Sequence, residues 1–252
     1  MGEALLYPWL VRGMVACALV SFTLLRYLSA PYGRHARAGW GPTMANRVGW
    51  VVMESPAVVV FLFIYMLGRG RSDIASQVLA AMWTLHYLYR AFLYPLRLPG
   101  PGRPVPILVV VLGAGFNVVN GYLNARWISE MHRYEDAWLT TPTFVFGSLL
   151  FVAGWAMNQH ADGRLLALRK PGETGYRVPR GGLFRWVSCP NYLGEILEWL
   201  GYALAAWSPA GLAFALYTAA NLVPRALSHH EWYLRTFRDY PRDRKAIVPG
   251  IL

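Results

Sequence analysis

Apolar residues fall along the chain into seven long runs, which short polar or Pro- and Gly-containing segments separate. Each run is close to the roughly 20 residues that a helix needs to cross a bilayer. The runs cover approximately residues 8–28, 47–67, 74–95, 106–126, 143–163, 190–207 and 210–231. The pattern predicts an all-α integral membrane bundle of seven transmembrane helices, built as one domain over residues 1–252. One alternative concerns the first run, whose uninterrupted core, residues 13–25, lies between Arg12 and Arg26 as in a signal peptide.

Composition supports lipid as the main solvent of this chain. Hydrophobic residues make up 56% of the sequence and charged residues 15%, whereas a soluble domain carries about 25% charged residues. Cys17 and Cys189 show no metal-ligand spacing, so neither a metal site nor a disulfide framework is expected. We also expect no nucleic-acid partner and no obligate protein partner.

Basic residues are distributed unevenly over the predicted loops. With seven crossings, the loops after the first, third and fifth runs share a side with the C-terminal tail. These segments carry Arg34, Arg37, Arg97, Arg103, Arg164, Arg169, Lys170, Arg177, Arg180, Arg185, Arg235, Arg238, Arg242, Arg244 and Lys245. The opposite loops carry Arg69, Arg71, Arg126 and Arg133. Because cytoplasmic loops are enriched in Lys and Arg, the C-terminus is predicted to be cytoplasmic and the N-terminus outside.

Polar residues inside the predicted helices repeat at spacings of three and four, which places them on single helix faces. Ionisable groups in hydrocarbon are costly and usually mark function. The faces are Trp83, Tyr87, Arg90 and Tyr94; Asn158 and Asp162; Asn191, Glu195, Glu198 and Tyr202; and Asn221, Arg225 and His229. At about 1.5 Å rise per residue, Glu54 and Tyr87 lie roughly 10 and 12 Å from the cytoplasmic ends of their helices. These positions predict one cavity that opens to the cytoplasm.

The types of residue around this cavity indicate its chemistry. The loop 164–189 combines arginines with Pro- and Gly-rich turns, which suit a phosphorylated ligand; a basic loop on an anionic leaflet is the alternative. Glu54, when protonated, and Tyr87 can both donate a hydrogen bond to a developing enolate oxygen, as reduction of a conjugated enone requires. An ordinary hydrogen bond between two helices is the alternative role for this pair.

Three long strings and three shorter ones resemble the steroid 5α-reductase family, within the wider group of membrane sterol and enoyl-CoA reductases. The long strings are LRKPGETGYRVPRGGLF with CPNYLGEILEWLGYALAAW, and HHEWYLRTFRDYPRDRKAIVPGIL at the C-terminus. The shorter ones, PYGRH, WVVMES and HYLYR, lie upstream in the same order. The resemblance implies NADPH inside a seven-helix bundle, hydride delivery to C5 of a 3-oxo-Δ4-steroid and proton addition at C4. It also implies the endoplasmic reticulum in a eukaryote, whereas the arginine bias favours a bacterial inner membrane.

The resemblance also assigns roles to individual positions. Glu54 and Tyr87 match the pair that grips and polarises the steroid C3 carbonyl. Positions that match the family's cofactor shell are Tyr32, Arg90, Arg103, Asn158, Asp162, Arg169, Tyr176, Arg177, Asn191, Glu195, Arg225, His229 and Tyr233. Trp50, Phe116 and Phe214 match apolar positions around the steroid. The loop 97–104 departs from the family pattern because it is richer in Pro and Gly, which puts the contact through Arg103 in question.

Three other functions fit parts of the same pattern. A related membrane reductase could act on another conjugated alkene, such as a sterol ring or an enoyl-CoA. A membrane methyltransferase that binds S-adenosylmethionine resembles the C-terminal half of the chain, but it needs no acid pair such as Glu54 and Tyr87. A transporter needs polar residues along its whole path, and the outer halves of these helices are apolar.

Overall fold

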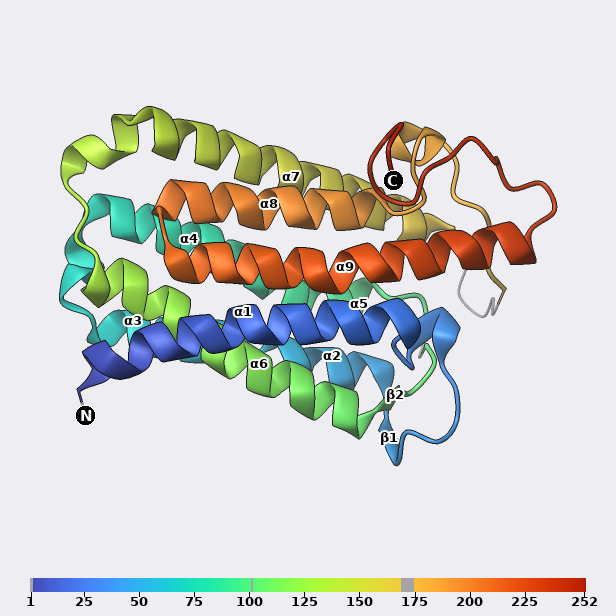
Figure 1. The fold of residues 1–252 in the computed structure, drawn as a ribbon, viewed down its shortest axis with the longest axis horizontal. Coiled ribbons are helices and arrows are strands. Elements are labelled where there is room, and N and C mark those ends of the chain that lie inside the picture. Colours follow the sequence, from blue (N-terminus) through green and yellow to red (C-terminus); the bar gives the residue numbers. More distant parts are fainter. Residues whose placement is uncertain (1, 101, 169–174) are drawn as a thin grey trace.

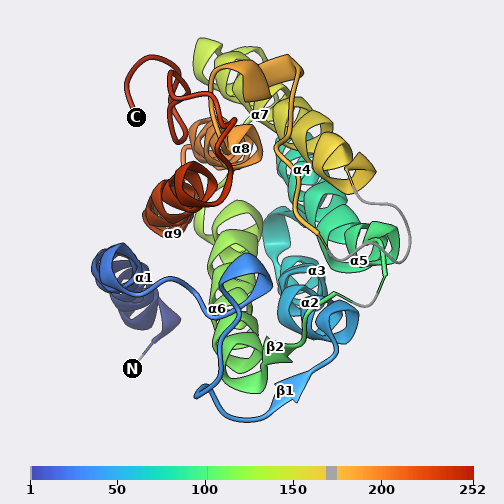
Figure 2. The ribbon, with the colours of Figure 1, turned by 90° about the vertical axis from the view of Figure 1, so that its right-hand side faces the viewer.

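The computed structural model describes residues 2–100, 102–168 and 175–252, and all seven predicted segments are helical in it. The helices are α1 (Glu3–Tyr27), α2 (Asn46–Glu54), α3 (Pro56–Leu67), α4 (Ile74–Leu88), α5 (Tyr94–Arg97), α6 (Ile107–Arg126), α7 (Pro142–Ala167), α8 (Pro190–Ala206) and α9 (Pro209–Thr236). The second predicted segment is divided into α2 and α3, and the third into α4 and α5. Figure 1 shows the long helices lying side by side in one bundle, and Figure 2 shows α1 at its edge beside α9.

Prolines explain both divisions. Pro56 is the first residue of α3, directly after Ser55, and it has no N–H to continue the hydrogen-bond ladder of α2. Pro95 follows a π-helical turn, Tyr89–Leu93, that joins α4 to α5. Such turns often mark functional sites. Glu54 lies beside the first break, and Arg90 lies inside the second.

The packing of α7 on α8 depends on glycines that let the two backbones approach each other. A Cβ added to Gly154 would clash with the backbone of Glu198, and one added to Gly194 would clash with the backbone of Asn158. Gly147 and Gly201 make the same kind of contact at the other end of the helix pair. Small residues permit such close packing between membrane helices. The close approach brings the polar faces of α7 and α8 together.

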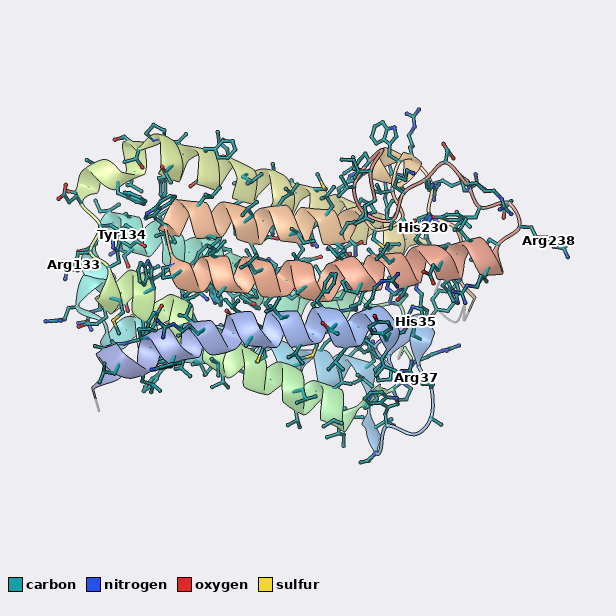
Figure 3. The ribbon with its side chains drawn as sticks, in the orientation of Figure 1. His35, Arg37, Arg133, Tyr134, His230 and Arg238 are labelled. Carbon is teal, nitrogen blue, oxygen red and sulfur yellow. The ribbon has the colours of Figure 1, made fainter. Side chains whose placement is uncertain are left out.

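The connecting segments gather at the two ends of the bundle as predicted. The segments that follow α1, α5 and α7 lie at one end with the C-terminal tail (Figure 1), and there Val187 forms a β-bridge with Lys245. Figure 3 shows His35, Arg37 and His230 at this loop end, which is the end that Figure 2 faces.

The opposite end of the bundle carries Arg133 and Tyr134 (Figure 3). Ion pairs join its segments: Arg69 to Glu130 at 2.6 Å, and Arg126 to Glu3 at 2.5 Å. Each end of the bundle is therefore stabilised separately: the loop end includes a β-bridge, and the opposite end includes ion pairs.

One feature of the loop end differs from the all-α prediction. Two short strands, β1 (Thr43–Met44) and β2 (Val105–Pro106), pair in antiparallel fashion. The N–H of Ile107 also donates to the Pro42 carbonyl at 3.0 Å. This pairing ties the segment after α1 to the start of α6.

Three helical stretches in the described residues are long and apolar enough to cross a membrane: Glu3–Tyr27, Asn46–Leu67 and Ile107–Met131. α4 and α8 are shorter, with 15 and 17 residues. α7 and α9 are longer but carry polar faces, which lower their hydropathy. Most large side chains of α1 are exposed and apolar, as expected of a surface that lipid covers.

We predict that Gly154→Ala destabilises the protein, because the added methyl group would separate the backbones of α7 and α8. Overpacking of this kind typically costs about 1–3 kcal/mol of unfolding free energy. Thermal unfolding of the purified protein in detergent measures the change. Gly163→Ala is the matched control, since it lies on the same helix and its added Cβ would meet nothing within 4 Å. Equal melting temperatures for the two variants would contradict the prediction.

Candidate active site

A cavity of about 400 Å³ lies between α1, α2, α4, α6 and α9, with part of the segment after α1 in its wall. Small-molecule sites typically measure about 300–1,000 Å³. The cavity reaches the loop end through Ala30, Tyr32 and Trp40. It is therefore large enough for a ligand of modest size.

Aromatic side chains form much of the apolar wall. Phe116 stacks on Tyr217 with 3.8 Å between ring centroids, and it packs on Phe214 at 6.2 Å. Trp50 meets the edge of Tyr94 at 5.4 Å. Rigid aromatic walls of this kind suit a flat, apolar ligand.

Glu54 and Tyr87 face this cavity from α2 and α4. Two asparagines on α6 engage them: the amide of Asn117 donates to Glu54 Oε2 at 3.2 Å, and the amide of Asn120 donates to the Tyr87 hydroxyl at 3.4 Å. Asn117 also donates to the Met53 carbonyl at 2.8 Å. Between Glu54 and Tyr87 themselves, the described residues show no direct hydrogen bond. Both side chains are thus held by α6 and face the cavity, where they can meet a ligand.

A charged network lies beside this pair. Arg90 is 3.7 Å from Asp162 and 3.8 Å from Glu195, and its guanidinium lies over the Trp50 ring at 4.6 Å. The network therefore joins the π-helical turn to α7 and α8.

Asparagines extend this network. Asn191 donates to Asp162 at 3.0 Å, and Asn158 donates to the Asn191 carbonyl at 3.0 Å. Asn158 also donates to Glu195 at 3.4 Å. The polar faces predicted for these helices therefore meet, as the sequence indicated.

A second polar group lies nearer the loop end, around Arg225. Its guanidinium lies over the rings of Tyr32 and Tyr192 at 4.9 and 5.5 Å. The Tyr192 hydroxyl is 3.1 Å from His229 Nε2, and His229 Nδ1 is 3.0 Å from His35 Nε2. Tyr32 and Arg225 line both the main cavity and a small adjoining pocket that includes His35 and His229.

Arg34 and Arg225 have the properties of an anion site. The Arg34 guanidinium lies 4.9 Å from the Trp232 ring and 4.7 Å from the Tyr233 ring, and its Nη1 is buried without a hydrogen-bond partner. Within the described part of the chain, Arg225 donates a single long bond, to Asn221 at 3.4 Å. Among the described residues, no carboxylate lies within ion-pair distance of either guanidinium. These unused donors fit the phosphate oxygens of a ligand.

The predicted site residues that the structure describes fall into four groups. Tyr32, Trp50, Glu54, Tyr87, Arg90, Phe116, Glu195, Phe214 and Arg225 line the cavity. Asn158, Asp162 and Asn191 lie behind Arg90, whereas His229, Tyr176 and Tyr233 lie near Arg225 and Arg34. Arg103 is exposed and does not line the cavity, and Arg177 is not among the lining residues either. Arg169 is outside the described residues.

Three polar or aromatic residues of the cavity wall that the sequence analysis did not consider are Trp40, His86 and Asn117. Asn120, which bonds to Tyr87 from behind the wall, was also not predicted. Asn117, Asn120 and Asn124 repeat at three and four residues in a run otherwise treated as apolar, so a signal was present. His86 adjoins Tyr87 but lies off the face that was considered. Trp40 lies between Gly39 and Gly41, which both have positive φ. Because this segment is an irregular loop, its sequence has no helical or strand periodicity from which the position of Trp40 could be predicted.

Comparison with known proteins gives consistent similarities. A family model described as 3-oxo-5-alpha-steroid 4-dehydrogenase matches residues 103–252. The chain is 44% identical to steroid 5-alpha-reductase DET2 of Gossypium hirsutum over 98% of this chain and 97% of the relative. It is 44% identical to 3-oxo-5-alpha-steroid 4-dehydrogenase 1 of Homo sapiens over 93% of this chain and 90% of the relative.

We predict that His35 makes stability depend on pH. Burial and the nearby charge of Arg34 lower the pKa of His35 to about 4, against about 6.5 in an unfolded chain. The folded state therefore favours the neutral ring, so this contribution is complete above about pH 6.5 and is lost as the pH falls toward 4. His35→Gln should lose less thermal stability than the parent protein between about pH 7 and pH 5.

Melting temperatures in detergent at both pH values test this prediction. His160→Gln is the control, because His160 is exposed and is not part of the contact between His35 and His229. It should follow the pH dependence of the parent protein. Identical slopes for His35→Gln and the parent would show that His35 does not contribute.

Proposed function

The chain belongs to the 3-oxo-5-alpha-steroid 4-dehydrogenase family, and from that membership we propose how its cavity carries out the reduction. The protein is an oxidoreductase that reduces the Δ4 double bond of a 3-oxosteroid to the 5α-dihydro product. We take NADPH as the reductant, with hydride addition at C5 and proton addition at C4. The observation that carries the proposal is the convergence of Glu54 and Tyr87 on an aromatic-walled cavity beside Arg90.

Glu54 and Tyr87 act on the C3 carbonyl of the steroid. When C5 receives a hydride, negative charge develops on the carbonyl oxygen, and hydrogen bonds that strengthen with this charge lower the barrier. Tyr87 donates as a neutral phenol, and Glu54 donates in its protonated form. The bonds from Asn117 and Asn120 fix both donors before the substrate binds. This geometry supports two convergent donors on one oxygen.

The aromatic wall binds the fused rings of the steroid. Trp50, Phe116 and Phe214 offer flat apolar surfaces around the cavity. Trp40 also lines the cavity, and we add it to the residues that contact the steroid. The rings exclude water from the reacting carbonyl, which strengthens the hydrogen bonds there. The substrate is therefore held mainly by apolar contact and oriented by its C3 ketone.

NADPH supplies the hydride when it is bound. The unused donors of Arg34 and Arg225 fit its phosphates, and Tyr32, His229, Tyr176 and Tyr233 surround these arginines. Arg90, Asn158, Asp162, Asn191 and Glu195 offer hydrogen bonds beside the cavity, where they can orient a polar ring. The donor set of the chain therefore fits a dinucleotide that enters from the loop end.

The distribution of basic residues over the two ends of the bundle supports a proposal for the membrane arrangement. We propose that α1, α2 with α3, α4 with α5, α6, α7, α8 and α9 make seven crossings. The loop end, which carries most basic residues, then faces the cytoplasm, where NADPH is available. The N-terminus lies outside. The membrane is the inner membrane in a bacterium and the endoplasmic reticulum in a eukaryote.

We predict that Tyr87→Phe and Glu54→Gln each lower kcat about 10²–10³-fold while NADPH still binds, because each removes or weakens a donor to the developing enolate. NADPH oxidation that depends on added 3-oxo-Δ4-steroid, with mass spectrometry of a product heavier by two hydrogen atoms, measures turnover. Tyr89→Phe is the matched control, since Tyr89 is on the same helical segment, bonds to Arg97 and lies outside the cavity. Full activity in both site variants would rule out the donor pair.

We predict that Arg225→Ala raises the KM for NADPH by roughly ten- to a hundredfold, the loss expected for hydrogen bonds to a charged group. The KM for steroid should change much less. Arg238→Ala removes the same charge from an exposed position at the loop end (Figure 3) and serves as the control. If both variants have the same KM for NADPH, bulk charge rather than a local contact attracts the cofactor.

A further inference from the structure

A buried histidine–carboxylate pair adjoins the cavity, and the roles described above do not use it. His86 on α4 lies 2.6 Å from Glu198 on α8, measured from Nδ1 to Oε1. Glu198 is 0% exposed and His86 is 5% exposed. Both ionisable groups are therefore almost entirely removed from bulk water, and only His86 keeps a small exposed fraction.

The surroundings of the pair are apolar on one side and charged on the other. The imidazole meets the edges of Trp199 at 4.5 Å and of Tyr87 at 5.0 Å. The second carboxylate oxygen of Glu198 is buried without a hydrogen-bond partner. Ionisable or charged groups that face His86 from other elements are Glu54 on α2, Arg90 on the π-helical turn, and Glu195 and Glu198 on α8.

A purely structural role explains this pair poorly. Replacing a buried ionic pair by apolar residues of similar size is often neutral or stabilising, and ionisable groups in membrane proteins usually mark function. The imidazole of His86 also forms part of the cavity wall. Its Nδ1 is engaged by Glu198, and the described part of the chain provides no hydrogen bond to its Nε2. One ring nitrogen is thus held in place while the other remains available to a ligand.

The proposed reduction needs a proton that its other groups do not provide. Glu54 and Tyr87 are assigned to the C3 oxygen, and Glu195 pairs with Arg90. Arginines keep their protons at all relevant pH values. Among the described residues that line the cavity, His86 is the only histidine, and histidine is the side chain best suited to proton transfer near neutral pH.

We propose that His86 is the proton donor to C4 of the steroid and that Glu198 is a positioning residue that orients its ring. The inference rests on the proposed function. C5 receives the hydride, the C4–C5 π electrons move toward C3, and the C3 oxygen carries the resulting negative charge. The enolate then collapses: a new C4–H bond forms while the Nε2–H bond of the His86 imidazolium breaks. The Glu198 carboxylate stabilises the imidazolium before transfer, and water restores the proton afterwards.

The first test is the turnover of His86→Gln. Its kcat should fall about 10²-fold or more, as expected when a general acid is removed, while the KM values for NADPH and steroid stay near those of the parent. Added imidazole should restore part of the rate in a concentration-dependent manner. His132→Gln is the matched control, because His132 also packs against aromatic rings but lies at the opposite end of the bundle.

The second test uses the position of deuterium in the product. In D₂O the parent enzyme should place deuterium on one face of C4, whereas His86→Gln should give a mixture of both C4 epimers, which NMR of the product resolves. Glu198→Gln should keep the stereochemistry but change the pH dependence of kcat, because an amide cannot neutralise the imidazolium. A structural role for the pair would not alter either readout.

The outcomes separate this inference from the proposed function. If the parent protein does not oxidise NADPH when steroid is added, the proposed function itself fails. If the parent is active and His86→Gln keeps the same kcat, pH profile and C4 stereochemistry, only the proton-donor inference fails. Loss of activity with a lowered melting temperature, no rescue by imidazole and unchanged C4 stereochemistry in the residual product would also overturn it in favour of a structural role.

Discussion

A charged side chain inside an apolar bundle is costly unless an opposite charge lies beside it, and the pairing of Arg90 with two carboxylates organises the centre of this protein. Arg90 lies 3.7 Å from Asp162 and 3.8 Å from Glu195, so one cation connects the turn after α4 to α7 and α8. Leaving one buried charge of such a set unpaired costs roughly 3–5 kcal/mol. The two carboxylates reach Arg90 together only because Gly154 and Gly194 let the backbones of α7 and α8 come close. Helix packing and site geometry therefore depend on the same contact.

The cavity separates two kinds of chemistry by position. Arg34 and Arg225 lie toward the loop end and keep donors that no carboxylate in the described residues satisfies. Glu54, Tyr87 and His86 lie further along the helices, and each is held by a neighbour that fixes its orientation. Fixed cations favour an anionic ligand, whereas oriented hydrogen-bond donors in an apolar wall favour a ketone. The two regions of the site therefore suit two unlike ligands.

Hydropathy and spacing predicted the helical segments and the meeting of Asn158, Asp162, Asn191 and Glu195, because both depend on periodicities that the sequence displays directly. They did not predict His86, since each residue rotates a helix by about 100° and His86 lies off the face of Tyr87. The position of Trp40 could not be predicted from the sequence for another reason. It depends on the pairing of β1 with β2, which joins segments about sixty residues apart. The roles of the individual site residues remain predictions.

Each of the two helix breaks positions a residue of the site. A proline leaves carbonyls of the preceding turn without their helical donor, and in an apolar bundle other groups must satisfy them. Asn117 donates to the Met53 carbonyl beside the break and also to Glu54, so one residue both bonds the backbone next to the break and orients the acid. At the second break, the π-helical turn before Pro95 carries Arg90 toward Asp162 and Glu195. Straightening either helix would remove the local geometry that its site residue uses.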